Sequence, residues 1–428
     1  MTSSIRRPST VAAFALGVCL TTACSHTFPE ATASPVEAMR RLGLFGDVFE
    51  KVRSTYVERP DEDKLIEGAI SGMLSSLDPH SAYLPPKEWK GMREQTRGEF
   101  GGLGIEVAME EGLVKVVSPI DDTPASRAGL LANDLIGKID DETVPGLTLA
   151  QCVERMRGKP GSKVRLTVVR KGTKEPFEVA MTREVIKVRP VKARAEGEVA
   201  YLRVSQFNEK TTEALHREMA RLEGEIGRER LRGWVLDLRN NPGGLLDQAV
   251  SVGGTFVGEG EIVSTRGRDP DDTQRFAAPS GSDRSGGRPL VVLVNGGSAS
   301  ASEIVAGAVQ DRKRGTVLGT RSWGKGSVQT LVPLGAQGAL KLTTARYYTP
   351  AGRSIQAKGI EPDVVVREVV PDDLKGKDET KGEVSLKGHL LNGDDADKGG
   401  SSAYVPQDPA KDTQLQAALE LVRKAGAR

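Results

Sequence analysis

The sequence feature that most constrains the fold is a short apolar run that ends in two glycines and continues as a helical pattern. Residues 289–295 read Pro-Leu-Val-Val-Leu-Val-Asn, which is typical of a strand buried on both faces. Gly296 and Gly297 then free the backbone to turn, and apolar residues recur at helical spacing from Ala301 onward. The pattern predicts that Ser300 lies at or just before a helix start, next to amides without partners in that helix.

Two residues near this turn could carry chemistry, and each also has a purely structural interpretation. Ser300 is either an activated serine or only a helix-capping residue in a turn of small side chains. Lys325 lies between Gly324 and Gly326 with little side-chain cover of its own, so a solvated surface lysine is the simpler alternative.

The spacing of this serine and lysine resembles that of the C-terminal processing peptidases, also called tail-specific proteases. In that family a Ser/Lys dyad cleaves proteins near their C-termini. On this pattern Ser300 matches the nucleophile, Lys325 the general base, and Gln329 the residue that holds the lysine in place. The resemblance implies a serine endopeptidase that recognises and cleaves exported proteins near their C-terminal tails.

The resemblance extends from about residue 36 to about residue 367 and implies a multidomain α/β protein. Its parts would be a crotonase/ClpP-like α/β protease core, an inserted PDZ domain that forms a β-rich, partly open barrel, and a helical N-terminal region. The residues themselves favour a mostly parallel sheet covered by helices, because strands and helices alternate from Glu198 onward. Strands are expected at 199–204 and 234–238, with a helix over 211–231.

Backbone amides near the serine could stabilise a developing oxyanion. The run Asn-Asn-Pro-Gly-Gly at 240–244 breaks the chain directly after a strand and before the helical stretch 245–252. The amide of Gly244 is therefore one candidate donor, and the amide of Ala301, which follows the nucleophile, is the other. A simple glycine turn is the structural alternative.

Residues 97–185 resemble a PDZ domain, in which Gly102, Leu103, Gly104 and Ile105 would form the carboxylate-binding loop. Glycines at these positions let successive amides converge on a carboxylate, and the next strand edge can pair with an extended peptide. The implied partner is a protein or peptide substrate with a free C-terminus. A tight turn that needs glycine, in a PDZ fold that only covers the active site, is the alternative.

The N-terminus is typical of an export signal. Arg6 and Arg7 precede a short apolar run, and the run ends at a small-residue box before Cys24. This box resembles a lipoprotein cleavage site, which would lipidate Cys24 and anchor the enzyme in the cell envelope. Cleavage after Ala23 or Ala33 would instead release a soluble periplasmic enzyme.

The chain is accordingly divided into six parts. They are a signal peptide at 1–24, an N-terminal helical region at 36–96, the PDZ domain at 97–185, the protease core at 186–368, a charged linker at 369–405 that is expected to be disordered, and a C-terminal helix at 406–428. Within the core, residues 268–288 are expected to form a surface loop. The final helix would dock on the body or bridge protomers, and a homo-oligomer or an adaptor protein remains open.

Composition and the other titratable residues narrow the function. A net charge of +2 gives no electrostatic footprint for nucleic acid. The four histidines lack the spacing of metal ligands, so neither a metal nor a cofactor is implied. His80 is expected to be a turn residue beside Pro79 and not a third member of a triad. Cys152 has the spacing of a buried structural cysteine.

Two other function classes compete with a protease. One is a hydratase or thioesterase of the crotonase type, and the PDZ-like unit and the Ser300/Lys325 pair speak against it. The other is a catalytically silent PDZ scaffold that binds protein tails.

A Ser/Lys protease needs a lysine that is neutral. Burial must therefore lower the pKa of the lysine from about 10.4 toward 7, which corresponds to roughly 4 to 5 kcal/mol of differential solvation.

Overall fold

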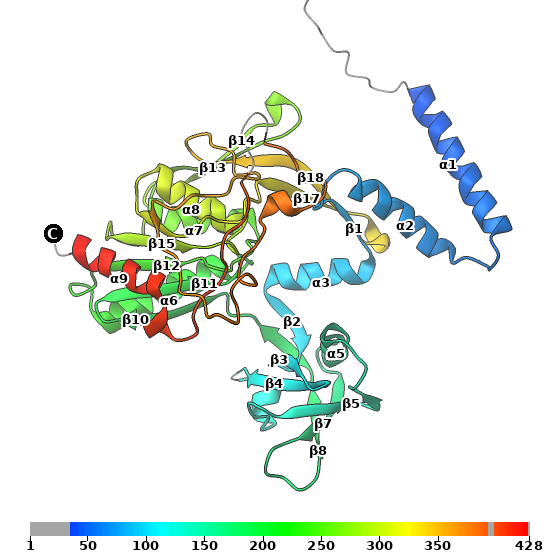
Figure 1. Ribbon diagram of the computed structural model, residues 1–428, viewed down its shortest axis with the longest axis horizontal. Coiled ribbons are helices and arrows are strands. Elements are labelled where there is room, and N and C mark those ends of the chain that lie inside the picture. Colours follow the sequence, from blue (N-terminus) through cyan, green and yellow to red (C-terminus); the bar gives the residue numbers. More distant parts are fainter. Residues whose placement is uncertain (1–34, 121, 393–397, 427–428) are drawn as a thin grey trace, which may run out of the picture. The chain divides into compact units, whose positions relative to one another are not determined.

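The computed structural model describes residues 35–120, 122–392 and 398–426, so the predictions for the leader 1–24 and for Cys24 lie outside the described residues (Figure 1). The chain divides into two compact units at Leu65. The first unit holds helix α1 (Pro35–Thr55), none of whose residues is buried, and the start of helix α2 (Glu62–Ser75). Over the described residues, no helix has the length and apolar character that crossing a membrane requires.

The N-terminal helical region contributes a strand to the protease core, which its predicted boundary at residue 96 did not anticipate. After α2 the chain forms strand β1 (Ala82–Leu84), which pairs antiparallel with strand β18 (Ala339–Tyr348). Helix α3 (Pro86–Arg97) follows, with proline at its first position and a left-handed Gly98 at its end. Residues 82–84 therefore join the sheet that contains β18, which lies within the predicted core range 186–368.

The PDZ domain is a six-stranded antiparallel sheet with two helices. Its strands are β3 (Ile105–Glu110), β4 (Leu113–Pro119), β5 (Leu135–Ile139), β6 (Glu142–Thr143), β7 (Lys163–Val169) and β8 (Phe177–Thr182). Helices α4 (Pro124–Arg127) and α5 (Leu149–Met156) complete it, and β2 (Glu99–Gly102) pairs with β9 (Glu184–Lys187). Cys152 is fully buried in this core, and burial raises the pKa of its thiol, as expected of a structural cysteine.

The core is built on one six-stranded sheet. In spatial order its strands are β10 (Val191–Glu196), β11 (Val199–Val204), β12 (Gly233–Asp237), β15 (Leu290–Val294), β16 (Thr316–Gly319) and β19 (Val364–Val365). All neighbouring pairs from β11 to β19 are parallel, and β10 adds an antiparallel edge. This confirms the mostly parallel sheet that the alternating pattern predicted.

Both faces of this sheet are covered, which explains its unbroken apolar strands. One cluster joins Leu290, Val292 and Val294 to apolar residues of helices α6 (Thr211–Ile226), α7 (Leu246–Val257) and α8 (Ala301–Asp311). The intervening residues Val291 and Leu293 face a second cluster with helix α9 (Thr413–Ala425). All five residues of β15 are buried, as the sequence predicted.

A second sheet contains the residues around the lysine. It consists of β1, β18, β13 (Gly260–Arg266) and β14 (Gln274–Ala278), with β17 (Ser327–Pro333) paired to β18. Strand β14 lies within 268–288, so the prediction of a surface loop there was wrong for 274–278. The reason is that Phe276 and Ala278 pack against the main apolar cluster and align the strand with β13.

The segment 369–405 is ordered over its described residues 369–392 and 398–405, so the prediction of disorder was wrong there. Figure 1 shows its orange trace lying against the core. Hydrogen bonds to its backbone carbonyls hold the segment to the core: the Gly296 amide donates to the Ser402 carbonyl at 2.9 Å, and the Asn240 side-chain Nδ2 donates to the Ala403 carbonyl at 2.9 Å. The segment therefore contacts the loop that follows β15 and the loop that follows β12.

Helix α9 docks on the core through a buried ion network and not only through apolar contacts. Arg239 directly follows β12 and is 1% exposed. Its guanidinium donates to both carboxylate oxygens of Asp237 and of Asp412, and Asp412 also accepts from the Leu415 amide at the start of α9. The last helix is thus connected to the loop that begins with Asn240. Of the two arrangements expected for this helix, it adopts docking on the body.

Candidate active site

Ser300 occupies a strained backbone position at the start of α8. Its φ of 53° and ψ of −112° are rare for a residue with a side chain, and such strain is held by the surrounding structure. The preceding glycines allow the tight approach: a Cβ on Gly296 would lie 2.2 Å from the Ser401 carbonyl oxygen, and one on Gly297 would lie 2.4 Å from Asn240 Oδ1. The turn therefore presents the serine on a crowded, fixed backbone.

The three serines of this turn have different surroundings. The Ser298 hydroxyl donates to the Leu238 carbonyl at 2.8 Å, and the Ser302 hydroxyl donates to the Asn241 carbonyl at 2.9 Å. Both residues are fully buried, whereas Ser300 is 8% exposed and its hydroxyl has no hydrogen-bond acceptor among the described residues. Of these three hydroxyls, the one of Ser300 alone donates to no acceptor among the described residues.

The loop that contains Gly244, one of the two predicted oxyanion donors, lies against the turn that carries Ser300 and Ala301. A Cβ on Gly243 would lie 2.9 Å from both Ser300 Cβ and the Ala301 nitrogen, so the 240–244 loop touches the nucleophile turn. Gly244 has a φ of 145°, and its close approach to the Phe207 carbonyl also excludes a side chain. Over the described residues, neither the Gly244 amide nor the Ala301 amide donates to a protein acceptor, and the role of both as oxyanion donors stays a prediction.

Lys325 lies in an extended loop packed against residues 356–359. A Cβ on Gly326 would lie 2.2 Å from the Gln356 nitrogen, and one on Gly324 would lie 3.2 Å from the Lys358 nitrogen. The glycines let this backbone close around Lys325, as the sequence predicted. Burial lowers the pKa of Lys325, and the nearby charge of Lys341 lowers it further.

Glu303 joins the serine to the lysine, and sequence reasoning did not identify this role. Its carboxylate is fully buried. Oε2 accepts from the amides of Ser300 at 2.7 Å and Lys325 at 3.0 Å. Oε1 accepts from the Gly324 amide at 2.7 Å and the Ser322 hydroxyl at 2.5 Å. One carboxylate thus fixes both backbone segments of the proposed dyad.

The protonation of Glu303 is sensitive to its burial. Desolvation raises its pKa to about 7, although the four hydrogen bonds favour the ionised form. The signal available in the sequence was a glutamate three residues after a helix-start serine, which is also the pattern of an ordinary capping pair.

Glu303→Gln is expected to lower kcat/KM by about tenfold to hundredfold, because an amide offers only one acceptor oxygen to four donors. The loss should appear mainly in kcat, since the substrate-binding loops are unchanged. Steady-state kinetics on folded enzyme would measure it, with the exposed Glu259→Gln as the matched control. Unchanged kcat in Glu303→Gln would show that this carboxylate does not position the two segments.

Gln329 is not hydrogen-bonded to Lys325 in the described structure. Its side-chain nitrogen donates to Ser327 Oγ at 2.9 Å and to Thr343 Oγ1 at 3.3 Å. The pairing of β17 with β18 is irregular between Val328 and Gln329, which turns the glutamine toward these hydroxyls. The side-chain oxygen remains available as an acceptor.

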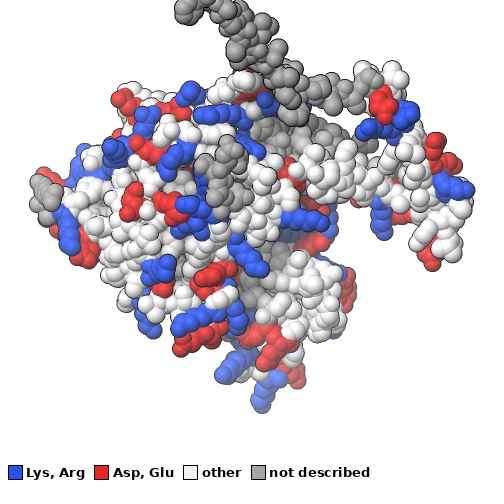
Figure 2. Space-filling model, turned by 45° about the horizontal axis from the view of Figure 1, so that its top comes forward, with Lys and Arg blue, Asp and Glu red and all other residues white. Residues whose placement is uncertain are grey.

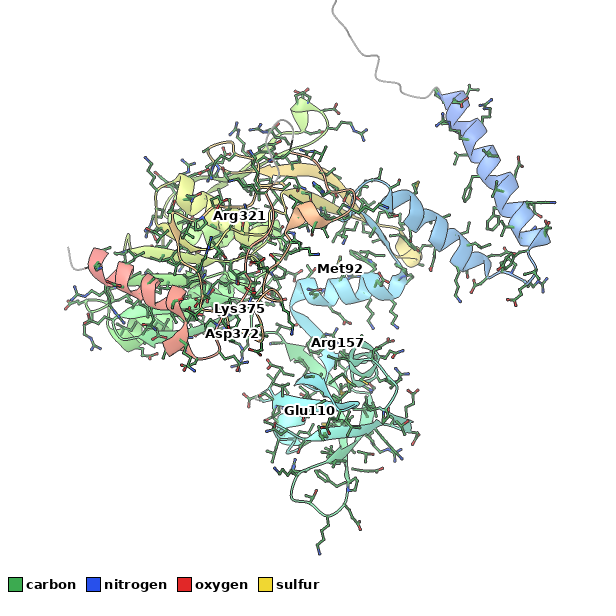
Figure 3. All side chains as sticks on the ribbon, in the orientation of Figure 1. Met92, Glu110, Arg157, Arg321, Asp372 and Lys375 are labelled. Atoms are coloured by element: carbon green, nitrogen blue, oxygen red, sulfur yellow. The ribbon has the colours of Figure 1, made fainter. Side chains whose placement is uncertain are left out.

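The predicted carboxylate loop of the PDZ domain lines a cavity. Gly102, Leu103, Gly104 and Ile105 form one wall of a cavity of about 80 Å³. Arg157, labelled in Figure 3, also lines the cavity, and its Cζ lies 4.3 Å from the Phe100 ring centre. Gly104 has a φ of 78°, and a Cβ there would collide with Thr123, which explains the glycine.

The face shown in Figure 2 carries Lys and Arg interspersed with Asp and Glu, in keeping with the small net charge. No single-sign surface dominates that view.

Comparison with known proteins gives three family matches along the chain. Residues 198–366 match peptidase family S41, residues 101–181 match a PDZ domain, and residues 21–87 match the N-terminal domain of the activating protease CtpB. The first match contains strands β11 to β19 of the core sheet, without the edge strand β10, and it contains both Ser300 and Lys325. The second agrees with the sequence-based assignment of the PDZ domain.

Curated relatives match over most of their length. A carboxy-terminal-processing protease from Bartonella bacilliformis is 55% identical over 385 residues, or 90% of this chain and 88% of the relative. The carboxy-terminal processing protease CtpB from Bacillus subtilis is 33% identical over 410 residues, or 90% of this chain and 82% of the relative. Among solved structures, a photosystem II D1 C-terminal processing protease is 32% identical with a TM-score of 0.45, over 78% of this chain and 95% of that one.

The matched core and PDZ domain, together with this identity over nearly the whole length, place the chain among serine-type peptidases. The chain belongs to peptidase family S41, as a member of its carboxy-terminal-processing proteases.

Proposed function

We propose that Ser300 and Lys325 form a Ser/Lys dyad that hydrolyses peptide bonds. The observation that carries this proposal is the single carboxylate of Glu303, which accepts from the amides of both residues, while the Ser300 hydroxyl donates to no acceptor among the described residues. The lowered pKa of Lys325 supports its role as a neutral base.

In this mechanism Lys325 takes the proton of the Ser300 hydroxyl as its oxygen attacks the scissile carbonyl carbon. The amides of Gly244 and Ala301 bind the resulting oxyanion. When the C–N bond breaks, the lysine ammonium gives its proton to the leaving amine, and an ester remains on the serine. Water then attacks the ester carbonyl carbon while Lys325 accepts one of its protons. The acyl C–O bond to Ser300 breaks, and the lysine returns the proton to the serine oxygen, which releases the acid and free Ser300. Gln329 Oε1 would accept a hydrogen bond from the lysine and orient it.

We propose that the PDZ loop at 102–105 binds the C-terminal carboxylate of the substrate. The cavity lined by this loop and the cationic Arg157 support the proposal. An extended tail would pair with the neighbouring strand edge and place an upstream bond for cleavage.

Amidating a substrate's C-terminus is expected to raise KM by about tenfold to hundredfold, because charge-assisted hydrogen bonds to the carboxylate are lost. kcat should change little, since the lost contact is remote from the reacting bond. Cleavage of one peptide in free-acid and amide forms measures the effect. Equal KM values for the two forms would contradict tail recognition, whereas a failure to cleave either form would contradict proteolysis itself.

We further propose that the core adopts a crotonase/ClpP-like arrangement. The parallel sheet that is covered by α6, α7 and α8 supports it, as do the paired backbone amides near Ser300. Hydrolysis or hydration of coenzyme A thioesters by the purified protein would favour the crotonase-type alternative over peptide hydrolysis.

Export and a lipid anchor on Cys24 are proposed from the leader sequence. Incorporation of labelled palmitate into the wild type, and not into Cys24→Ala, would support the anchor. A soluble periplasmic product cleaved at Ala23 or Ala33 is the opposite outcome.

We also propose a homo-oligomer or an adaptor that covers the exposed apolar residues Met39 and Leu42 of α1. Light scattering of the purified chain would test for the oligomer.

A further inference from the structure

We propose that Glu383 and His80 form a positioning pair that holds the loop carrying Lys325 in its productive arrangement. The inference rests on the proposed role of Lys325 as the general base. It assigns a function to one residue in the segment that was expected to be disordered, and to a histidine that was expected to shape only a turn.

Glu383 is a fully buried carboxylate whose partners all lie around the lysine loop. Its Oε1 accepts from His80 Nε2 at 2.8 Å, and its Oε2 accepts from Trp323 Nε1 at 3.1 Å. Its own amide donates to the Trp323 carbonyl at 3.1 Å. Trp323 is therefore held through both its side chain and its backbone.

The other side of Lys325 is held through one amide. Gln356 Nε2 donates to Glu383 Oε1 at 3.2 Å, and Gln356 Oε1 accepts from the Gly326 amide at 3.0 Å. Gln356 is fully buried. The residues on both sides of Lys325 are thus connected to one carboxylate.

Glu383 keeps its charge in this site. Burial opposes ionisation, but the hydrogen bond and charge of His80, followed by the bonds from Trp323 and Gln356, lower the pKa of Glu383. An ionised acceptor makes stronger hydrogen bonds than a neutral one. Removing His80 therefore favours the neutral form of Glu383 and weakens the hydrogen bonds that Trp323 and Gln356 donate to it.

The backbone around His80 is itself fixed to the lysine's sheet. Asp78 Oδ1 accepts from the His80 amide at 2.8 Å and from Thr343 Oγ1 at 3.0 Å. Thr343 lies on β18 and also accepts from Gln329. The turn that follows α2 therefore contacts the surroundings of both Lys325 and Gln329. Among the described residues the His80 ring bonds to Glu383, and no hydrogen bond or ion pair joins it to Ser300.

Glu383 also affects the pKa of Lys325, and a residue that only packed against the loop would not change this pKa through its charge. Burial and Lys341 lower the pKa of Lys325. The carboxylates of Glu383, Glu303 and Asp78 raise it. Neutralising Glu383 should therefore lower the pKa of the lysine further, while loosening its loop.

Glu383→Gln is expected to lower kcat by about tenfold or more with KM within about twofold, because a small displacement of the base slows only the chemical step. The acidic limb of kcat/KM should also move to lower pH. His80→Ala should lower kcat severalfold, and His80→Gln, which can still donate to Glu383, should recover part of the loss. The matched controls are Glu379→Gln, an exposed carboxylate in the same segment, and His216→Ala, a histidine that bonds Thr255 instead.

Trp323→Phe removes only the indole donor to Glu383, and it replaces Glu383→Gln in this test if that variant does not fold. Unchanged kcat per folded enzyme, or an unmoved acidic limb in Glu383→Gln, would overturn the inference and leave a purely structural role. The dyad itself is tested separately: if Lys325→Ala stays active, the proposed function fails. If Lys325 is essential while Glu383→Gln and Trp323→Phe behave as wild type, only the positioning role fails.

Discussion

Ser300→Ala is expected to lower kcat by about 10⁴-fold to 10⁶-fold, because removal of a nucleophile abolishes the acyl-enzyme route and leaves only binding and oxyanion stabilisation. Folding should be preserved, since the hydroxyl has no protein acceptor among the described residues and the residue is 8% exposed. The backbone amide that binds Glu303 is retained in the variant. Peptide cleavage by the purified variant, with its thermal midpoint measured in parallel, tests the expectation.

The neighbouring serines provide matched controls for this result. Ser298→Ala and Ser302→Ala each remove a buried hydroxyl that donates to a carbonyl, so each should lower the unfolding free energy by about 1 to 3 kcal/mol. Both should keep substantial activity when folded. If Ser302→Ala is inactive and Ser300→Ala is active, Ser302 is the nucleophile and the assignment must move.

The strand, turn and helix around Ser300 could be predicted because their sequence patterns and their burial agree. The apolar run at 289–295 became the fully buried β15, and the helical spacing began at Ala301, where α8 begins. The order of apolar and polar side chains within a short segment shows which of them are buried, and this pattern predicts buried strands and amphipathic helices. The glycines at 296 and 297 likewise reflect local crowding.

The polar connections between distant segments could not be predicted in this way. Glu303 looks like a capping residue until Ser322, Gly324 and Lys325 are seen to donate to the same carboxylate. These hydrogen bonds depend on which loops the fold brings together. The spacing of apolar residues in the sequence does not predict them.

Composition failed for 369–405 for a related reason. A charged segment with few apolar residues is usually solvated, because it cannot bury enough surface to offset its ordering entropy. Here the described residues gain backbone hydrogen bonds to core loops, such as the bond from Gly296 to Ser402. Glu383 adds a buried charge with three donors around it.

Lys325→Arg is expected to lower kcat/KM by about 10²-fold to 10⁴-fold, because a guanidinium stays protonated and cannot act as a general base. In the wild type, burial lowers the pKa of Lys325, so the fraction of neutral amine rises as pH increases through that lowered value. Activity should therefore fall on the acidic side as the lysine becomes protonated. Measuring kcat/KM against pH in free enzyme reports this limb.

Two titrating groups could produce that limb, and the variants separate them. The pKa of Glu303 is raised to about 7 by burial, so its ionisation would also rise in this range. Glu303→Gln cannot ionise at this position, and it should keep an acidic limb at reduced kcat if Lys325 is the base. Lys325→Ala should lose nearly all activity, and small primary amines added to it should restore part of the rate with the amine's own pKa. A limb that disappears in His80→Ala while Lys325→Ala remains active would instead make the histidine the base and refute the Ser/Lys mechanism.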